Sequence, residues 1–175
     1  MEKLTIIGGG NLGKSILAGL VNSDLFKKEN ITAVDKSPAN LQYIKENLGI
    51  NGSSDINESV IDAKWIILCV QPRQLDTVLQ EIKGKVKQDQ VLISTVTGTS
   101  IEEINAIVPN NKIVRVMPNT GASKQLSMTC IAANDNAKEE LAMVVKMFDT
   151  IGKTLAIEER LMQAATVLGA SGIAF

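Results

Sequence analysis

The sequence predicts an α/β protein with a doubly wound, mostly parallel sheet flanked by helices. Short, almost continuously apolar segments recur along the chain, as expected for strands of a parallel sheet that is covered on both faces. Segments with the apolar spacing of amphipathic helices lie between them. Strands that alternate with helices in this way are typical of doubly wound sheets.

The predicted elements follow one another without a long linker or an internal repeat. We expect strands over the apolar runs 4–7, 31–34, 65–70, 91–95, 113–117 and 128–132. We expect helices over 12–21, 39–47, 56–62, 75–83 and 101–108. Two of these helices have start signals, because Ser37 precedes Pro38 and because Ser100 and Glu103 have the spacing of a capping box.

The pattern changes near residue 136. Residues 136–152 predict a long amphipathic helix, 153–158 a short strand, and the mostly apolar run 160–175 a further helix. An apolar run at the end of the sequence has nothing downstream to cover it, which predicts a missing C-terminal portion or a partner subunit. We therefore expect one domain over 1–157 and the start of a truncated helical domain over 158–175.

Composition narrows the classes of partner. The chain has 175 residues, a formal net charge of -1 and 45% hydrophobic residues, which gives no general attraction to nucleic acid or to an anionic membrane. No apolar run approaches the ~20 residues that span a bilayer, and the first residues lack the pattern of a secretory signal. We therefore expect a cytoplasmic protein without nucleic-acid or membrane partners.

The sequence also limits the chemistry. Histidine is absent, which excludes a Ser-His-Asp mechanism and histidine metal ligands within this chain. The two cysteines, Cys69 and Cys130, lie far apart in apolar segments. They are predicted to be buried small side chains, so we expect neither a disulfide nor a metal site.

A glycine-rich turn follows the first predicted strand. Gly8, Gly10 and Gly13 form a GxGxxG pattern that leads into a helix, and Asp35 ends the second strand. In this context Gly8 can make the tight turn, Gly10 lets the backbone approach a pyrophosphate, and Gly13 lets helix and strand pack closely. The alternative is that the glycines serve only packing, which the helix and the acidic residue disfavour. The turn therefore predicts a dinucleotide site, with the N–H groups of the helix start facing the phosphates.

The residues after the second strand leave the choice between NAD and NADP open. Asp35 favours NAD, because a carboxylate accepts from ribose hydroxyls and repels a 2′-phosphate. Lys36 and Ser37 stand beside it and could hold that phosphate. Lys36 is equally well explained as a solvated surface lysine.

Three further loops follow predicted strands, where the carboxyl ends of a parallel sheet place ligands. In CVQPRQL, residues 69–75, Pro72 would fix the loop and could pack on the cofactor. The stretch STVTG, residues 94–98, could offer backbone and hydroxyl contacts. In VRVMPNT, residues 114–120, Asn119 could hydrogen-bond a nicotinamide carboxamide or a substrate. Arg115 is unusual within a strand pattern and predicts either a sheet edge or an acidic partner.

Taken in order, four stretches resemble pyrroline-5-carboxylate reductases: IGGGNLGKSILAGL, CVQP, VRVMPNTGA and FDTIGKTLAIEERLMQAATVLGASGIAF. The resemblance covers essentially the whole chain. It implies a Rossmann-like N-terminal domain that binds NADPH or NADH, and a C-terminal helical domain that forms an intertwined dimer and completes the substrate site. The implied reaction, the last step of proline biosynthesis, transfers a hydride from nicotinamide C4 to the imine carbon of 1-pyrroline-5-carboxylate. This chain alone is then expected to bind cofactor without efficient turnover.

The resemblance also assigns cofactor contacts by position. It implies a phosphate turn, a ribose or 2′-phosphate region, one adenosine-side contact, and two loops beside the nicotinamide half. The phosphate turn consists of Gly8, Gly10, Asn11 and Leu12, and the ribose or 2′-phosphate region of Lys36 and Ser37. The adenosine-side contact is Asn57. The two loops beside the nicotinamide half contain Val70, Gln71 and Pro72, and Val96 and Thr97. Asn119 and Ser171 are the candidates for positioning nicotinamide or substrate.

Some residues depart from the family pattern, mostly on the substrate side. Gly121 stands where the family usually has proline, and Gln163 replaces an aspartate. The stretch GASGIAF replaces a motif that usually reads SGSGPAF, so Gly169, Ala170 and Ile173 differ. Two alternatives therefore stay open: a related two-domain NAD(P)-dependent reductase of another imine or keto acid, and a non-catalytic NAD(P)-binding regulatory protein.

Overall fold

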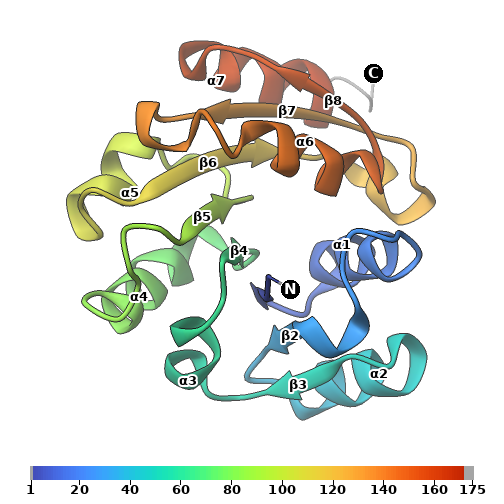
Figure 1. Ribbon diagram of the computed structural model, residues 1–175. Coiled ribbons are helices and arrows are strands. Elements are labelled where there is room, and N and C mark those ends of the chain that lie inside the picture. The colour runs from blue at the N-terminus through green and yellow to red at the C-terminus, as the bar shows by residue number, and fades with distance from the viewer. Residues whose placement is uncertain (1, 172–175) are drawn as a thin grey trace.

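One eight-stranded sheet runs through the computed structural model, which describes residues 2–171 (Figure 1). The strand order is β3-β2-β1-β4-β5-β6-β7-β8. Neighbouring strands are parallel except β6 and β7, which are antiparallel. The chain runs outward from β1 first to β3 and then, from β4, to the other side. The carboxyl ends of β1 and β4 therefore form the switch point of a doubly wound sheet, where such folds bind ligands.

The strands are short and, near the centre of the sheet, almost wholly apolar. Their bounds are β1 Leu4–Ile7, β2 Ile31–Val34, β3 Asn51–Ser53, β4 Trp65–Leu68, β5 Val91–Ser94, β6 Lys112–Met117, β7 Ser127–Ala133 and β8 Gly152–Ala156. The α-helices are α1 Asn11–Val21, α2 Pro38–Leu48, α3 Ile56–Ile61, α4 Pro72–Ile82, α5 Ile101–Ile107, α6 Leu141–Asp149 and α7 Met162–Thr166.

Two hydrophobic cores hold the layers together, one on each face of the sheet. On one face α1, α2 and α6 pack on the sheet around Ile16, Ile44 and Phe148. On the other face α3, α4 and α5 pack around Val60 and Leu79. Figure 1 shows these two groups of helices on opposite sides of the strands. The predicted fold class is therefore confirmed in its sheet, its parallel strands and its two helical layers.

The predicted helix starts at Ser37 and Ser100 are confirmed. The Ser37 hydroxyl accepts the Asn40 N–H at 3.4 Å, and Pro38 is the first helical residue. The Ser100 hydroxyl accepts the Glu103 N–H at 3.2 Å, while the Glu103 carboxylate accepts the Ser100 N–H at 2.7 Å. Each cap satisfies amide donors that the first turn of a helix leaves without partners.

Strand β3 and the predicted helix over 136–152 differ from the prediction. Strand β3 was not expected, because it is polar and largely exposed and so carries no apolar signal. The predicted helix over 136–152 is too long: residues Asp135–Ala137 form a separate 3-10 turn, and the helix ends at Asp149. It cannot continue into Gly152, since that residue has φ +153° and already pairs with Ser127 in the sheet.

The predicted single helix over 160–175 is divided where it is described. A 3-10 turn over Glu159–Leu161 leads into α7, and a π-helical turn over Val167–Ser171 follows. Of the departures from the family pattern, Ile173 lies outside the described residues. The backbone of Ser171 is described, but its side chain is not.

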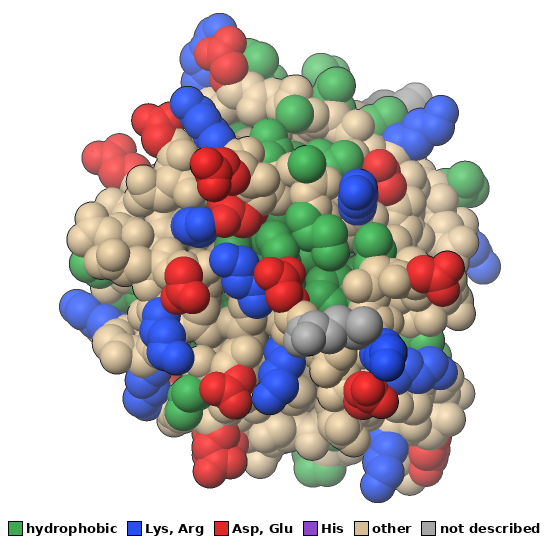
Figure 2. All heavy atoms as spheres, viewed as in Figure 1, with side chains coloured by type: hydrophobic (Ala, Val, Ile, Leu, Met, Phe, Trp, Pro, Cys, Tyr) green, Lys and Arg blue, Asp and Glu red, His purple; other side chains and the backbone are tan. Residues whose placement is uncertain are grey.

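The surface carries both signs of charge. Figure 2 shows basic and acidic side chains interspersed over one face, with hydrophobic side chains gathered near its middle. Over residues 2–171, none of the helices is long and apolar enough to cross a membrane.

Candidate functional site

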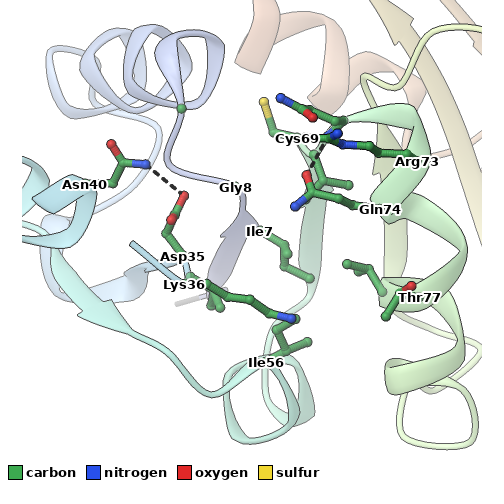
Figure 3. Close-up of a pocket in the computed structure, with 15 residues that line it drawn as sticks. Ile7, Gly8, Asp35, Lys36, Asn40, Ile56, Cys69, Arg73, Gln74 and Thr77 are labelled. Atoms are coloured by element: carbon green, nitrogen blue, oxygen red, sulfur yellow. Dashed lines mark hydrogen bonds between the residues drawn. The ribbon is translucent and has the colours of Figure 1, made fainter. Parts of the chain in front are cut away.

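A cleft of about 410 Å³ opens at the carboxyl ends of β1, β2 and β4 (Figure 3). Three segments form its walls: the glycine turn, the residues after β2, and the turn between β4 and α4. Among the predicted cofactor residues it is lined by Gly8, Gly10, Asp35, Lys36, Val70 and Gln71. These residues come from turns that follow three different strands, as the topology of the fold predicts.

The glycine turn requires glycine at two of its positions. Gly8 has φ +110°, and a Cβ there would lie 2.1 Å from the Cys69 carbonyl oxygen. A Cβ on Gly13 would lie 2.0 Å from the Gly8 carbonyl oxygen. The predicted roles of Gly8 in the tight turn and of Gly13 in strand–helix packing therefore agree with the geometry.

Gly10 leaves the start of α1 open. It is the N-cap residue with φ −71°, no side chain caps the helix, and a Cβ there would meet nothing within 4 Å. The first N–H groups of this 11-residue helix, among them those of Asn11, Leu12 and Gly13, have no acceptor within the helix. The Leu12 side chain itself packs against the core. An uncapped helix start beside a cleft suits a phosphate group.

Asp35 is bound by the protein itself. Its Oδ2 accepts the Gly9 N–H at 2.7 Å, and its Oδ1 accepts the Ser37 N–H at 2.7 Å. The Asn40 side-chain amide donates to Oδ2 at 3.3 Å (Figure 3). The Asn40 amide oxygen in turn accepts from Lys14 at 2.8 Å. The carboxylate predicted to hold ribose hydroxyls therefore connects the glycine turn to the end of β2.

Two cations line the cleft. Lys36 and Arg73 are both exposed, and within residues 2–171 neither has an ion pair or a side-chain hydrogen bond. The Lys36 side chain extends toward Ile56 in Figure 3. Arg73, Asn40 and Gln74 also lie in the cleft wall and were not among the predicted cofactor residues. The signal for Arg73 was its place directly after Pro72 in the second loop.

The turn between β4 and α4 has a cap of its own. The Gln71 N–H donates to the Gln74 side-chain oxygen at 3.1 Å. Pro72 is the first residue of α4 and does not line the cleft. It therefore sets the start of the helix, which presents Gln74 to the cleft, and its predicted packing on the cofactor stays a prediction.

Several predicted residues lie outside the cleft. The amide oxygen of Asn57 accepts from Lys85, and Ser37 caps α2. Val96 is buried in the core and Thr97 is exposed in the loop after β5. Asn119 follows β6, and its side chain accepts the Gly121 N–H at 3.0 Å.

Cys69 lies in the cleft wall without being reactive. Burial raises the pKa of its thiol to about 11, and a hydrogen bond with Thr95 opposes this shift. The thiol is therefore protonated at neutral pH and unsuited to act as a nucleophile. Among residues 2–171 there is no group of three or more acidic, histidine or cysteine side chains that could hold a metal ion.

The two explanations offered for Arg115 have separate outcomes. The sheet edge is wrong, because β6 lies between β5 and β7 and Arg115 pairs there with Ser94 and Ala132. The acidic partner is confirmed: the Arg115 guanidinium lies 3.2 Å from the Glu159 carboxylate. No nearby sequence signal links these two residues, because 44 positions separate them.

A doubly wound sheet with a glycine turn at its switch point defines the class of dinucleotide-binding α/β folds. Residues 3–98 match the family described as "NADP oxidoreductase coenzyme F420-dependent". The chain belongs to this family.

The chain is also similar to pyrroline-5-carboxylate reductases over nearly its whole length. It is 35% identical to pyrroline-5-carboxylate reductase 1 of Dictyostelium discoideum over 98% of the chain, which spans 33% of that protein. The crystallised reductase of Coxiella burnetii is 26% identical, with a TM-score of 0.94, and the chain spans 65% of it. The Plasmodium falciparum enzyme, crystallised with NADP bound, is 29% identical, with a TM-score of 0.87 and 64% of its chain spanned. The predicted resemblance is confirmed over the part of these proteins that this chain spans, which is less than two thirds.

Proposed function

We propose that this chain is the cofactor-binding part of an NAD(P)H-dependent reductase that converts 1-pyrroline-5-carboxylate to L-proline. The observation that carries the proposal is the uncapped start of α1 above a glycine turn, in a chain whose relatives along its length are pyrroline-5-carboxylate reductases. The NADP described for the Plasmodium enzyme supports the same cofactor class here. We extend the proposal to the domain division, with residues 1–157 binding the cofactor and 158–175 leading into a second domain.

The chain's own residues would bind and orient the cofactor. The N–H groups at the start of α1 face the pyrophosphate, and Gly10 leaves room for its approach. Lys36 supplies positive charge at the adenosine end, and Arg73 adds positive charge from the turn between β4 and α4. A reduced nicotinamide, when bound, supplies the hydride for the imine carbon. A protonated imine is already electrophilic, so the absence of histidine from the sequence is compatible with this reaction.

Both cofactors fit the residues after β2, with more support for NADP. The charge of Asp35 is met by three N–H donors of the protein, which lessens its repulsion of a 2′-phosphate. Lys36 and Arg73 lie in the same cleft. Ser37, which caps α2 and does not line the cleft, follows Lys36 directly in the chain. A cytoplasmic location stays a prediction.

The identity of the substrate is a more specific proposal than the class of cofactor. Gly121, one of the departures from the family pattern, lies in a tight turn where a Cβ would be 2.6 Å from the Leu126 carbonyl oxygen. Proline at this position would therefore require the turn to shift. A different substrate for the same two-domain plan is the alternative, and the assay below separates the two.

Titration and assay test the proposal in two steps. The chain should bind NADPH or NADH, followed through the fluorescence of the reduced nicotinamide. A protein that contains the chain together with the second domain should then oxidise that cofactor when 1-pyrroline-5-carboxylate is added. Binding without oxidation would contradict the substrate and leave the cofactor site standing. Absence of binding would contradict the cofactor site.

We further propose that the protein self-associates through the β7–β8 end of the sheet. Met128 is 48% exposed and Leu155 55% exposed. Their strands pair in parallel, with Met128 opposite Lys153 and Cys130 opposite Leu155, so both apolar side chains lie on the same face. An exposed apolar face of this kind is typical of a protein interface.

A further inference from the structure

Glu159 joins segments that are far apart in the sequence. Its Oε1 accepts the Ile101 N–H, the first amide of α5, at 2.7 Å. The same oxygen accepts from the Arg115 guanidinium on β6 at 3.2 Å. Glu159 itself lies in the 3-10 turn that leads from β8 to α7. One carboxylate therefore connects α5, the centre of β6 and the segment that follows the sheet.

Arg115 depends on this carboxylate. Its side chain is 10% exposed, and Glu159 is its ion-pair partner among the described residues. Its Nε is buried without a hydrogen-bond partner in that part of the chain. Removing the partner of a buried charge is costly, because the remaining charge has neither water nor a counter-ion. Loss of the Arg115–Glu159 pair should therefore cost more stability than loss of an exposed surface ion pair.

The loop between β5 and α5 is held at both of its ends. At its start, the Thr95 N–H and hydroxyl both donate to the Leu68 carbonyl oxygen, at 3.0 and 3.1 Å. At its end, Glu159 holds Ile101. Between these anchors Thr97 is exposed and Gly98 adopts φ +82°. The position of the exposed loop is therefore set from one end by a residue of the C-terminal segment.

The C-terminal segment is itself anchored on the sheet. The Ile157 N–H donates to the Ile131 carbonyl oxygen at 2.8 Å, which extends the contact between β8 and β7. Met162, the first residue of α7, is fully buried against Met117 and Ala132. Figure 1 shows α7 packed beside the β7–β8 end of the sheet. Glu159 lies between these two anchors, so its carboxylate couples the direction of α7 to the β5–α5 loop.

We propose that Glu159 is a positioning residue of the cofactor site, which holds the β5–α5 loop in place for the nicotinamide half of the dinucleotide. Strand β5 pairs in parallel with β4, so the loop after it lies at the same edge of the sheet as the cleft. The inference rests on the proposed function, because only a reductase of the resembled family would take Val96 and Thr97 of this loop as contacts beside the nicotinamide. Glu159 does not line the cleft and acts through Ile101 and Arg115. Its replacement should therefore affect the nicotinamide half and spare the adenosine half.

Two ligands separate these halves. NADPH contains both, whereas 2′-phospho-ADP-ribose lacks the nicotinamide ring. Glu159→Gln keeps an acceptor oxygen but removes the counter-charge of Arg115, so it should weaken NADPH binding by about two- to tenfold, the range expected when charge-assisted hydrogen bonds become neutral ones. It should leave the affinity for 2′-phospho-ADP-ribose unchanged. Glu158→Gln is the matched control, because Glu158 is exposed and pairs with Arg160 two positions away.

Amide hydrogen exchange provides a readout that needs no cofactor. Glu159→Ala removes the acceptor of the Ile101 N–H, so exchange across residues 96–101 should rise, while Glu158→Gln leaves it unchanged. Arg115→Lys provides a second variant, because it keeps the charge and loses the fork geometry of the guanidinium. It should reproduce the selective loss of NADPH affinity even if the Glu159 variants fold poorly.

The outcomes distinguish this inference from the proposed function. If the unmodified chain binds neither this pair of ligands nor the matching pair of NADH and ADP-ribose, the cofactor site itself is wrong and this role of Glu159 is wrong with it. If it binds both ligands and Glu159→Gln weakens both equally or neither, the cofactor site stands and the positioning role is overturned. A lower melting temperature without a selective loss of NADPH affinity would likewise reduce Glu159 to a structural residue.

Discussion

Asp35 stands where dinucleotide-binding folds have the acidic residue that binds ribose, but in this structure its carboxylate is bound by groups of the protein itself. Its carboxylate accepts from Gly9, Ser37 and Asn40, and so supports the shape of the glycine turn. Asp35→Asn should therefore weaken NADH and NADPH binding by similar factors, about two- to tenfold for one lost hydrogen bond. Parallel titrations of both reduced cofactors would measure this.

The control for that substitution is Asp24→Asn, an exposed carboxylate in the loop after α1. It should leave both affinities unchanged. A selective loss of NADH affinity on Asp35→Asn would instead mean that the carboxylate holds the ribose hydroxyls, as the sequence pattern alone suggests.

Gly13 and Gly10 belong to the same motif, but only at Gly13 would a side chain clash with the protein. Gly13→Ala places a methyl group 2.0 Å from the Gly8 carbonyl oxygen. It should lower the free energy of unfolding by about 1–3 kcal/mol, as overpacking does. Gly10→Ala meets no atom within 4 Å and should change stability little, yet its methyl group narrows the phosphate approach and should weaken cofactor binding. Thermal unfolding and titration of both variants measure the two effects; equal stability of the two would contradict this account.

At the scale of elements, the capping box of α5 predicts a pH dependence. Hydrogen bonds from the Ser100 backbone and hydroxyl lower the pKa of Glu103 below its ordinary value of 4.5. A carboxyl whose pKa is lower in the folded protein contributes stability above its unfolded pKa and loses it as the pH falls through the folded pKa. The melting temperature of the unmodified chain should therefore fall more steeply below about pH 4.5 than that of Glu103→Gln.

The control for this prediction is Glu102→Gln, which changes a carboxyl of the same turn that makes no side-chain hydrogen bond in the described structure. It should retain the steep acid dependence. Identical pH profiles for the unmodified chain and for Glu103→Gln would show that the box makes no contribution.

The elements that the sequence predicted well are those whose signal is local. Buried parallel strands such as β1 and β4 are continuous apolar runs, and helix starts carry serine and proline signals. Strand β3 is polar because it lies at the exposed edge of the sheet, so it has no such signal. In the site, the glycine turn was predictable because its strand, helix and acidic residue are close in sequence. The contact of Glu159 with Ile101 was not, since 58 positions separate them.

At the scale of the whole molecule, the apolar face at the β7–β8 end of the sheet predicts self-association. The Met128→Lys, Leu155→Lys double variant places two like charges on that face, next to the existing Lys153. Charge at the centre of an apolar interface opposes association, because it must be desolvated without a partner. Sedimentation velocity over a range of protein concentrations should show that the unmodified chain associates and that the double variant stays monomeric.

Ile61→Lys provides the matched control for this last prediction. Ile61 is 46% exposed at the end of α3, which packs on the opposite wing of the sheet from β8. Its replacement adds charge and removes an exposed apolar side chain without touching the β7–β8 face, so association should persist. If Ile61→Lys and the double variant reduced association equally, the effect would come from net charge and solubility. If neither reduced it, the interface would lie elsewhere on the molecule.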